Sequence, residues 1–547
     1  MREKQAEQLI REEKGGIYNP KIGTRVVLVF PNSYYLGMSS LGFQVILNEI
    51  NDHPLASCER GFYEEYNSQS LPVSFETQKP ISSFDIVGFS VAFEMDYINV
   101  VSIIHNSGMP LTSEKRGKHD PLIIAGGICV TFNPEPIAPF IDAIVIGDGE
   151  VISREIVTRY RLWQKTKRDR KELLLELSRI DGVYVPSLYD VEYNKDGTIS
   201  SVTSSAGVKS VVKRFNSGDL DNINTASKII TPNTEFSSCF LVEVVRGCAN
   251  RCKFCIASYS QKCRIRSTKE VLNLTKGELA HQADKIGLVG SSVVDHPDID
   301  RITESLLNAG HKISVASVRA DSVSEKFLDA LVASNQRTIT LAPEAATDKL
   351  RKAIGKNMSI EVVYDTIELA VRKGISNIKL YFMVGLPGEE EDDVLGIISV
   401  SNNARNLLLD YARDKNIIPP NLVISISPFV PKPHTPFQWC KMEDAKILSK
   451  KLKFLRKELM RVGGIKVPSS SARLSAIQGV LSRGDRKLAK VLTEMAERSL
   501  SWQQAIKSNG LSPDFYLEKN KEIFPWDHID LGISRENLKK LRPGIYS

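Results

Sequence analysis

The sequence lacks a long apolar run. Its most hydrophobic stretches, Leu122 to Val130 and Ala143 to Ile146, are short and are broken or bounded by glycine and charge. A helix needs about 20 apolar residues to cross a bilayer, so we expect no membrane span. Residues Met1 to Lys14 are charged and lack the apolar core of a secretory signal. This predicts a cytoplasmic protein with reduced thiols.

Low-complexity segments and an extreme charge balance are also missing. Hydrophobic residues make up 42% of the chain and charged residues 25%, which excludes a largely disordered or collagen-like protein. The net charge of +7 is spread over 547 residues, so it permits nucleic acid as a partner without indicating it. A chain of this length is longer than a single hydrophobic core usually accommodates, so we expect several domains.

The N-terminal part alternates strand-like and helix-like patterns. The predicted strands are 25–30, 85–91, 122–126 and 143–147, and the predicted helices are 39–51 and 96–107. This alternation is typical of a Rossmann-like, doubly wound α/β sheet. Ligands of such sheets bind beyond the carboxyl ends of the strands, where this chain has Pro31-Asn32-Ser33, Ser90, Gly126-Gly127 and Gly147 to Glu150.

A second alternation begins after Cys239, with predicted strands at 241–245, 286–290, 313–318, 338–342, 378–384 and 422–426. We therefore expect four parts. They are a Rossmann-like domain (1–150), a connector with a helix and a hairpin (151–238), a barrel-like domain (239–440) and a mostly helical C-terminal region (441–547). The hairpin is indicated by the turn Asn194-Lys195-Asp196-Gly197.

Three of the eight cysteines crowd into the loop after the predicted strand 241–245. Cys248, Cys252 and Cys255 have the spacing CxxxCxxC. Three thiolates cannot all pair as disulfides, and structural zinc prefers four ligands, whereas a four-iron cluster held by three cysteines leaves one iron open. The alternatives are a zinc site completed by Cys239, Cys263 or a histidine, and reactive thiols without a metal.

This loop resembles that of the radical SAM superfamily, and the resemblance covers residues 239 to 439. It implies a partial (β/α)6 barrel in which Cys248, Cys252 and Cys255 hold a four-iron, four-sulfur cluster. The open iron would bind S-adenosylmethionine (SAM), and reduction would cleave it to a 5'-deoxyadenosyl radical. An electron donor such as flavodoxin or ferredoxin is then an expected partner.

The same resemblance implies a set of SAM-binding residues at the ends of later strands. They are Gly290, Ser291 and Ser292 after the second strand, Ser317 and Arg319 after the third, Glu344 after the fourth, and Gly385 in the motif Met383 to Glu389. For Arg319 and Glu344 the alternative is a salt bridge at the barrel rim. The alternative for the late motif is a strand followed by a turn.

The N-terminal part resembles the cobalamin-binding-type domain that is fused to many radical SAM proteins. Ile123 to Gly127 and Asp142 to Glu150 carry this resemblance, and Arg483-Gly484-Asp485-Arg486 extends it toward one subgroup. The DxHxxG motif, whose histidine would ligate cobalt, is missing from the sequence. This domain is therefore expected to bind either cobalamin or a substrate alone. We also expect it to cap the barrel.

Three functional hypotheses follow. The first is a radical SAM enzyme that abstracts hydrogen from, or methylates, an unactivated carbon of an unknown substrate. The second is a methylthiotransferase-like enzyme that modifies RNA or protein, suggested by Gly290 to Pro297, although no second cysteine triplet is present. The third is a non-enzymatic iron-sulfur redox sensor. His296, His434 and Cys440 are further candidates for the site, and no catalytic residue is predicted.

Overall fold

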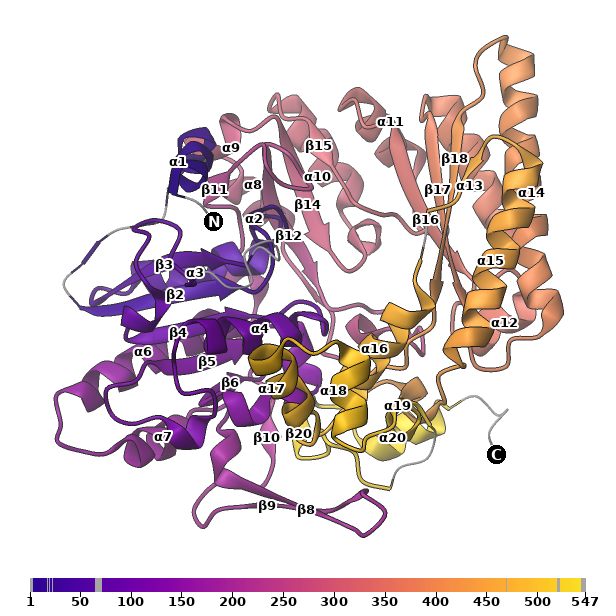
Figure 1. Ribbon diagram of the computed structural model, residues 1–547. Helices are drawn as coiled ribbons and strands as arrows, with labels where there is room; N and C mark the ends of the chain where they lie inside the picture. The colour runs from indigo at the N-terminus through magenta and orange to yellow at the C-terminus, as the bar shows by residue number, and fades with distance from the viewer. Residues whose placement is uncertain are drawn as a thin grey trace. The chain divides into compact units, whose positions relative to one another are not determined.

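The computed structural model describes residues 3–16, 18, 20–21, 23–63, 71–468, 470–518 and 522–542 (Figure 1). The chain divides into two compact units. Unit 1 contains residues 1–239 and 480–534, and unit 2 contains residues 240–479 and 535–547. The C-terminal region predicted at 441–547 is thus shared between the two units, and the four-part division of the sequence stays a prediction.

Unit 1 is built on a six-stranded sheet in the order β3-β2-β4-β5-β6-β7. Its first five strands are parallel, and β7 pairs with β6 in the antiparallel direction. Strand β2 is buried along its length except at Arg25, as expected for a sheet covered on both faces. The strands are β2 (Thr24–Phe30), β3 (Ala56–Phe62), β4 (Ile86–Ser90), β5 (Leu122–Gly126), β6 (Ala143–Val145) and β7 (Val183–Tyr184).

Helices follow the strands of this sheet as the alternation predicted. Helix α3 begins where the Ser40 hydroxyl accepts a hydrogen bond from the backbone N–H of Phe43. The predicted Rossmann-like α/β class is confirmed. The helices of this part are α1 (Glu3–Glu12), α2 (Tyr34–Met38), α3 (Leu41–Asp52), α4 (Asp96–Asn106), α5 (Ile128–Phe132), α6 (Gly149–Gln164) and α7 (Arg170–Ser178).

The rest of unit 1 comes from the connector and from residues after 479. The predicted hairpin is present as β8 (Tyr189–Tyr193) and β9 (Ile199–Ser204). The residues after 479 contact the connector, since their strand β20 pairs with β10 in the parallel direction. The other elements are β1 (Lys14–Gly15), β10 (Val212–Lys213), β11 (Ile229–Ile230), α17 (Leu488–Arg498), α18 (Trp502–Ser508), α19 (Pro513–Leu517) and β20 (Ile529–Asp530).

Unit 2 holds two four-stranded sheets, in the orders β13-β12-β14-β15 and β16-β17-β18-β19. The backbone N–H of Val318 donates to the carbonyl of Thr340 at 3.1 Å and so joins the segment after β15 to β16. The strands are β12 (Cys239–Arg246), β13 (Arg264–Ile265), β14 (Lys285–Gly290), β15 (Ile313–Ser314), β16 (Thr338–Glu344), β17 (Asn377–Val384), β18 (Asn421–Pro428) and β19 (Ile465–Lys466).

Helices alternate with these strands, which gives unit 2 its barrel-like order. Ser267 caps α8, where its hydroxyl accepts from the backbone N–H of Glu270, and α13 ends at Gly374, whose φ of 109° favours glycine. The helices are α8 (Thr268–Leu274), α9 (Glu278–His281), α10 (Ile299–Asn308), α11 (Glu325–Ala333), α12 (Asp348–Ala353), α13 (Ile360–Lys373), α14 (Glu391–Lys415), α15 (Ala445–Val462), α16 (Ala472–Arg483) and α20 (Arg535–Lys540). Across the described residues, no helix has both the length and the apolar character that crossing a membrane requires.

Candidate functional site

The cysteine loop lies at the carboxyl end of β12 and is closed by β13. The two strands pair at Val245 with Ile265 and at Arg246 with Arg264, so residues 247 to 263 form one closed loop. Inside it, the backbone N–H of Cys248 donates to Ala257 and that of Cys255 donates to Cys252, each at 3.1 Å. These bonds fold the loop back on itself and bring its cysteines together.

The three thiols are sheltered and lie near one another. Cys252 is buried, and Cys248 and Cys255 are half-buried. Burial raises the pKa of Cys252 to about 11, and the neighbouring charge of Cys255 contributes. The pKa of Cys255 is raised by burial and then by Cys248. Within the described part of the chain, no three His, Cys, Asp or Glu side chains are arranged as a finished metal site.

Three neighbouring thiols and an apolar wall fit an iron-sulfur cluster. Thiolates are the ligands of such clusters, and their surroundings control access of water. Phe254, between the second and third cysteine, packs against a buried cluster that includes Leu386, Phe437 and Cys440. The wall therefore comes from three distant segments of unit 2.

A polar chain leads from Cys248 to the end of the third strand. The Asn250 amide donates to Asp295 Oδ2 at 2.7 Å and lies 3.5 Å from the Cys248 sulfur. Arg319 Nε lies 4.0 Å from Asp295 Oδ1, and its guanidinium also pairs with Asp321. Arg319 thus forms a rim salt bridge and still lies close enough to Cys252 to affect its pKa.

Glu344 and Lys356 form a second ion pair near Cys252. Lys356 Nζ lies 3.5 Å from Glu344 Oε1, and both side chains are largely buried. Burial raises the pKa of Glu344 even though Lys356 opposes the shift. Glu344 has a φ of 68°, a conformation that non-glycine residues adopt infrequently and that is often held at functional sites.

The segment that carries Lys356 is tied to the cysteine loop. The backbone N–H of Lys253 donates to the carbonyl of Ile354 at 2.8 Å. A Cβ on Gly355 would lie 2.7 Å from the carbonyl oxygen of Arg251, so a glycine permits this close approach. Both contacts place Lys356 beside the loop.

The other predicted SAM-binding residues occupy varied environments. Gly290 ends β14 against β12, where a Cβ would lie 2.9 Å from the Val245 carbonyl oxygen. Ser291 and Ser317 are exposed. The hydroxyl of Ser292 is buried without a hydrogen-bond partner among the described residues, as is Arg319 Nε. The backbone N–H of Gly385 donates to Glu389 Oε2 at 2.8 Å.

These two buried atoms, which lack a hydrogen-bond partner among the described residues, can each bond to a polar ligand. SAM carries an amino group, a carboxylate and ribose hydroxyls, and these groups match the hydroxyl of Ser292 and the guanidinium of Arg319. The residues of this region therefore fit SAM, beside thiols that would hold a cluster.

Sequence reasoning missed Asn250, Asp295 and Lys356 as members of this site. Asn250 lies within the CxxxCxxC motif, and Asp295 lies in the segment that suggested a methylthiotransferase. Lys356 follows the fourth strand after a short helix, and its place depends on the contact between Ile354 and Lys253. Sequence spacing does not reveal that contact.

The remaining candidates have structural surroundings. His296 is buried, with Nε2 2.8 Å from the carbonyl oxygen of Arg266 and Nδ1 accepting from the backbone of Asp298. Cys440 lies in the apolar cluster beside Phe254. His434 is buried with a φ of 54°, and its backbone N–H donates to Gln438.

At the carboxyl edge of the sheet in unit 1, two polar side chains meet. The Asn32 amide donates to Asp96 Oδ1 at 2.9 Å, and burial raises the pKa of Asp96 to about 6. Two glycines at this edge allow other backbone segments to approach closely. A Cβ on Gly127 would lie 2.5 Å from the Val91 carbonyl oxygen, and one on Gly147 would lie 2.3 Å from that of Phe215.

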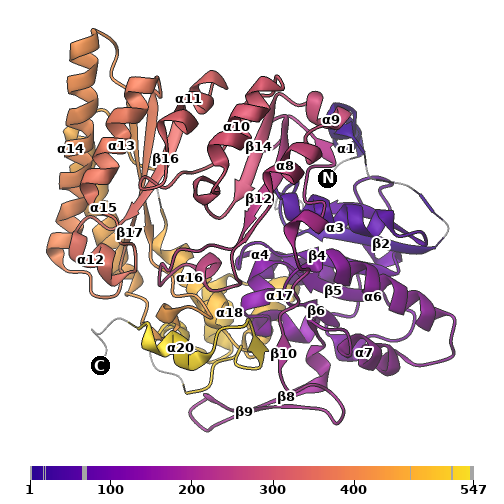
Figure 2. The ribbon, with the colours of Figure 1, turned by 180° about the vertical axis from the view of Figure 1, so that it is seen from behind.

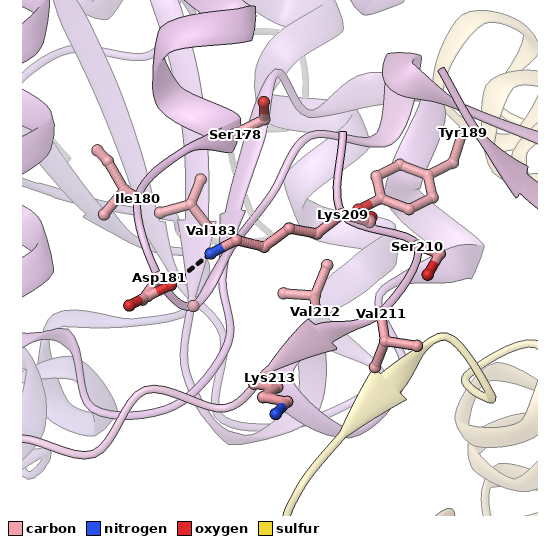
Figure 3. A pocket seen from close by; sticks show the side chains of 11 residues that line it. Ser178, Ile180, Asp181, Val183, Tyr189, Lys209, Ser210, Val211, Val212 and Lys213 are labelled. Carbon is pink, nitrogen blue, oxygen red and sulfur yellow. Dashed lines mark hydrogen bonds and ion pairs between the residues drawn. The ribbon is translucent and has the colours of Figure 1, made fainter. Parts of the chain in front are cut away.

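A separate pocket of about 510 Å³ lies in unit 1 between the end of α7 and the segment before β10 (Figure 3). Lys209 and Asp181 form an ion pair across it, and Val183 and Val212 contribute apolar surface. None of its lining residues is a predicted site residue.

Comparison with known proteins identifies the family and the fold. The family model "Radical SAM proteins, N-terminal" matches residues 42–186, and the model "Radical SAM superfamily" matches residues 242–400. An uncharacterized protein of Methanocaldococcus jannaschii is 26% identical over 520 residues, which are 93% of this chain and 100% of that protein. An uncharacterized methyltransferase of Pyrococcus horikoshii is 22% identical over 349 residues, which are 60% of this chain and 68% of that protein.

A solved structure shares the fold. The radical SAM methyltransferase TsrM of Kitasatospora setae, with tryptophan and a SAM analog bound, has a TM-score of 0.50 and 12% identity, and the match covers 87% of this chain and 99% of that chain. The two family models together extend over both parts in which the sequence showed strand and helix alternation. The chain therefore belongs to the radical SAM superfamily and is an enzyme that uses SAM and a four-iron, four-sulfur cluster.

Proposed function

We propose that Cys248, Cys252 and Cys255 hold the cluster and that SAM binds beside Cys252. The observation that carries the proposal is the meeting of three sheltered thiols with Arg319, Glu344 and Lys356 at one edge of unit 2. When bound, the cluster supplies the electron that cleaves SAM to methionine and a 5'-deoxyadenosyl radical. The radical then abstracts hydrogen from, or helps to methylate, a carbon of the substrate.

The residues of the chain bind and orient SAM in this proposal. The cations of Arg319 and Lys356 attract the SAM carboxylate, and the hydroxyl of Ser292 gains the partner that it lacks. Glu344 accepts from ribose hydroxyls or from the amino group. Phe254 and the apolar residues behind it keep water away from the thiolates.

Anaerobic reconstitution tests the ligand assignment. The protein should hold about four irons and four sulfides per chain. Alanine at Cys248, Cys252 and Cys255 should remove them, whereas Cys263→Ala and Cys440→Ala should retain them. Iron that persists in the triple variant, or zinc at full occupancy, would show that the assignment is wrong.

Product analysis separates the functional hypotheses. With reduced cluster, the protein should form 5'-deoxyadenosine and methionine from SAM, measured by mass spectrometry. A fully loaded and reduced protein that yields no 5'-deoxyadenosine would favour the redox sensor. Transfer of a methylthio group to RNA or protein would favour the second hypothesis.

Cobalamin in unit 1 is a finer proposal, supported by fold similarity to TsrM, whose structure was also solved with cobalamin and a four-iron, four-sulfur cluster. Gly127 and Gly147 are already approached by the chain's own backbone, so a corrinoid would instead meet Asn32 and Asp96 at the same edge. Reconstitution with hydroxocobalamin tests this. Retention of the corrinoid after desalting, with S-adenosylhomocysteine as a second product, supports methyl transfer through cobalamin. A spectrum without corrinoid after desalting would contradict this proposal.

A further inference from the structure

Helix α15 of unit 2 carries an unusual concentration of positive charge. Its 18 residues, AKILSKKLKFLRKELMRV, contain seven Lys or Arg and a single acid, Glu458. The helix packs beside α14 at the outside of the second sheet (Figures 1 and 2). Leu448, Leu455 and Leu459 form its buried stripe.

Four lysines of α15 form a stripe opposite this buried face. Lys446, Lys450, Lys453 and Lys457 recur at intervals of four, three and four residues and are all exposed. With 3.6 residues per turn, this spacing aligns them along one side of the helix.

The lysine stripe is not neutralised by the protein itself. Among the described residues, none of the four ammonium groups forms an ion pair, and several acids near α15 pair with other cations. Glu389 and Glu443 both pair with Lys451, and Glu458 pairs with Arg461. The stripe therefore presents four exposed ammonium groups, of which Lys450 alone lies beside the acids of the neighbouring cavity.

Large apolar side chains stand next to the stripe. Ile447 is 46% exposed, Phe454 is 41% exposed and Met460 is 60% exposed. Beside Phe454, a cavity of about 380 Å³ lies between α15 and the start of α14. Its wall has Val394 and Leu395 as apolar residues and Glu389, Glu390 and Glu391 as acids. Aromatic and Met side chains are enriched at protein-binding surfaces. Single-stranded nucleic acid would need rings on which bases can stack, and of these three side chains only Phe454 has one.

The start of α15 is close to the predicted SAM-binding end of unit 2. A Cβ on Gly385, at the end of β17, would lie 2.7 Å from the side chain of Leu448. Phe437 and Cys440, shortly before α15, pack in the cluster that touches Phe254 of the cysteine loop. The first turn of α15, with Lys446, therefore lies toward the same end of the strands as the thiols, and the later lysines extend from there along the helix.

We propose that the lysine stripe and Phe454 form the docking surface for an acidic electron-transfer protein. The proposal rests on the proposed function, because radical SAM chemistry requires a reductant. In the transfer step one electron passes from the reduced partner to the oxidised cluster, so the partner is oxidised and the cluster reduced. No covalent bond forms or breaks in this step.

The test combines a charge-reversed variant with a matched control. The variant carries Lys446→Glu, Lys450→Glu, Lys453→Glu and Lys457→Glu. The control carries the same four charge reversals at exposed residues of unit 1, namely Lys165, Lys167, Lys171 and Lys195. Circular dichroism checks that both proteins are folded.

The first measurement is binding of fluorescently labelled flavodoxin, which is independent of turnover. The wild-type protein and the control should bind, with affinity that falls as salt is raised. The variant should bind at least about tenfold more weakly, with a reduced salt dependence. Phe454→Ala should weaken binding with the salt dependence retained.

The second measurement is formation of 5'-deoxyadenosine with two reductants. With dithionite, which needs no docking, all proteins should react at equal rates. With flavodoxin and its NADPH-dependent reductase, the variant alone should be slower by about tenfold or more. No product with dithionite would overturn the proposed function itself.

Other outcomes decide against the docking surface. Equal flavodoxin binding by wild type and variant, or equal flavodoxin-driven rates in the presence of normal dithionite rates, would overturn it. Weaker binding of tRNA by the variant, with flavodoxin binding unchanged, would assign the stripe to nucleic acid instead.

Discussion

Lys356 and Glu344 form an ion pair whose removal has two separable consequences. Burial makes an unpaired charge costly, so loss of the lysine alone leaves Glu344 destabilised. If Lys356 also attracts the SAM carboxylate, its loss weakens SAM binding independently of that cost. A variant that neutralises both partners distinguishes the two effects.

We predict that Lys356→Met combined with Glu344→Gln retains about four irons per chain but binds SAM at least about tenfold more weakly. Equilibrium binding of SAM and iron analysis measure the two properties. Lys352→Met, an exposed neighbour, is the control and should behave as wild type. Unchanged SAM affinity in the double variant would assign the pair to structure.

The stability of unit 1 should depend on the protonation of Asp96. Burial raises its pKa to about 6, with the charge of Glu94 contributing. The folded state therefore binds more protons than the unfolded chain between about pH 4 and pH 6, and stability falls as pH rises through this window.

Asp96→Asn keeps an oxygen that accepts from Asn32 and removes the ionisable group. We predict that it flattens the pH dependence and raises the free energy of unfolding by up to about 3 kcal/mol above pH 6. Urea unfolding at a series of pH values measures this. Asp190→Asn, at an exposed position of β8, should leave the profile unchanged. A profile of Asp96→Asn that matches wild type would contradict the prediction.

At the scale of elements, apolar strands were predictable and charged ones were not. The alternation located β2, β4 and β5 to within a residue or two. It missed β3 (Ala56–Phe62), because Glu59 and Arg60 interrupt its apolar pattern. Arg60 is buried between Glu13 and Glu76, and no local pattern reveals partners that distant. The predicted third strand of the barrel is shorter than expected, with only Ile313 and Ser314 assigned as β15.

The motif Arg483 to Arg486 joins the turn before α17 to the sheet of unit 1. The Arg486 guanidinium donates to Glu135 Oε2 at 2.7 Å and to the hydroxyl of Tyr184 at 2.6 Å. Burial alone would raise the pKa of Glu135, but Arg486 and His528 bring it below its ordinary value. The Asn133 amide donates to the carbonyls of Ser482 and Gly484.

We predict that Arg486→Ala lowers the free energy of unfolding by about 3–5 kcal/mol, because it leaves Glu135 buried without its main partner. Urea unfolding measures the loss. Arg498→Ala removes an exposed ion pair with Glu494 and should cost less than about 1 kcal/mol. Equal effects of the two substitutions would argue against the buried pair as a stabilising contact.

At the scale of the whole molecule, unit 1 is completed by residues that follow most of unit 2 in the sequence. Leu488, Val491 and Leu492 of α17 are buried, and α17 packs against α4. We predict that a chain ending at Gly479 exposes the apolar surface beneath α17, binds the dye ANS and aggregates. A chain ending at Ser534 retains this segment and is the control. Size-exclusion chromatography that shows a monomeric 1–479 chain would contradict the prediction.

The long separation between Glu135 and Arg486 also has a consequence for biosynthesis. The two residues are 351 positions apart, so the carboxylate leaves the ribosome well before its guanidinium. At about 5–20 residues per second, the interval is roughly 20–70 s. During this time the nascent N-terminal sheet lacks the helix that packs against α4, and Glu135 lacks its guanidinium partner. Chaperones that shield nascent chains therefore have a defined interval in which this protein needs them.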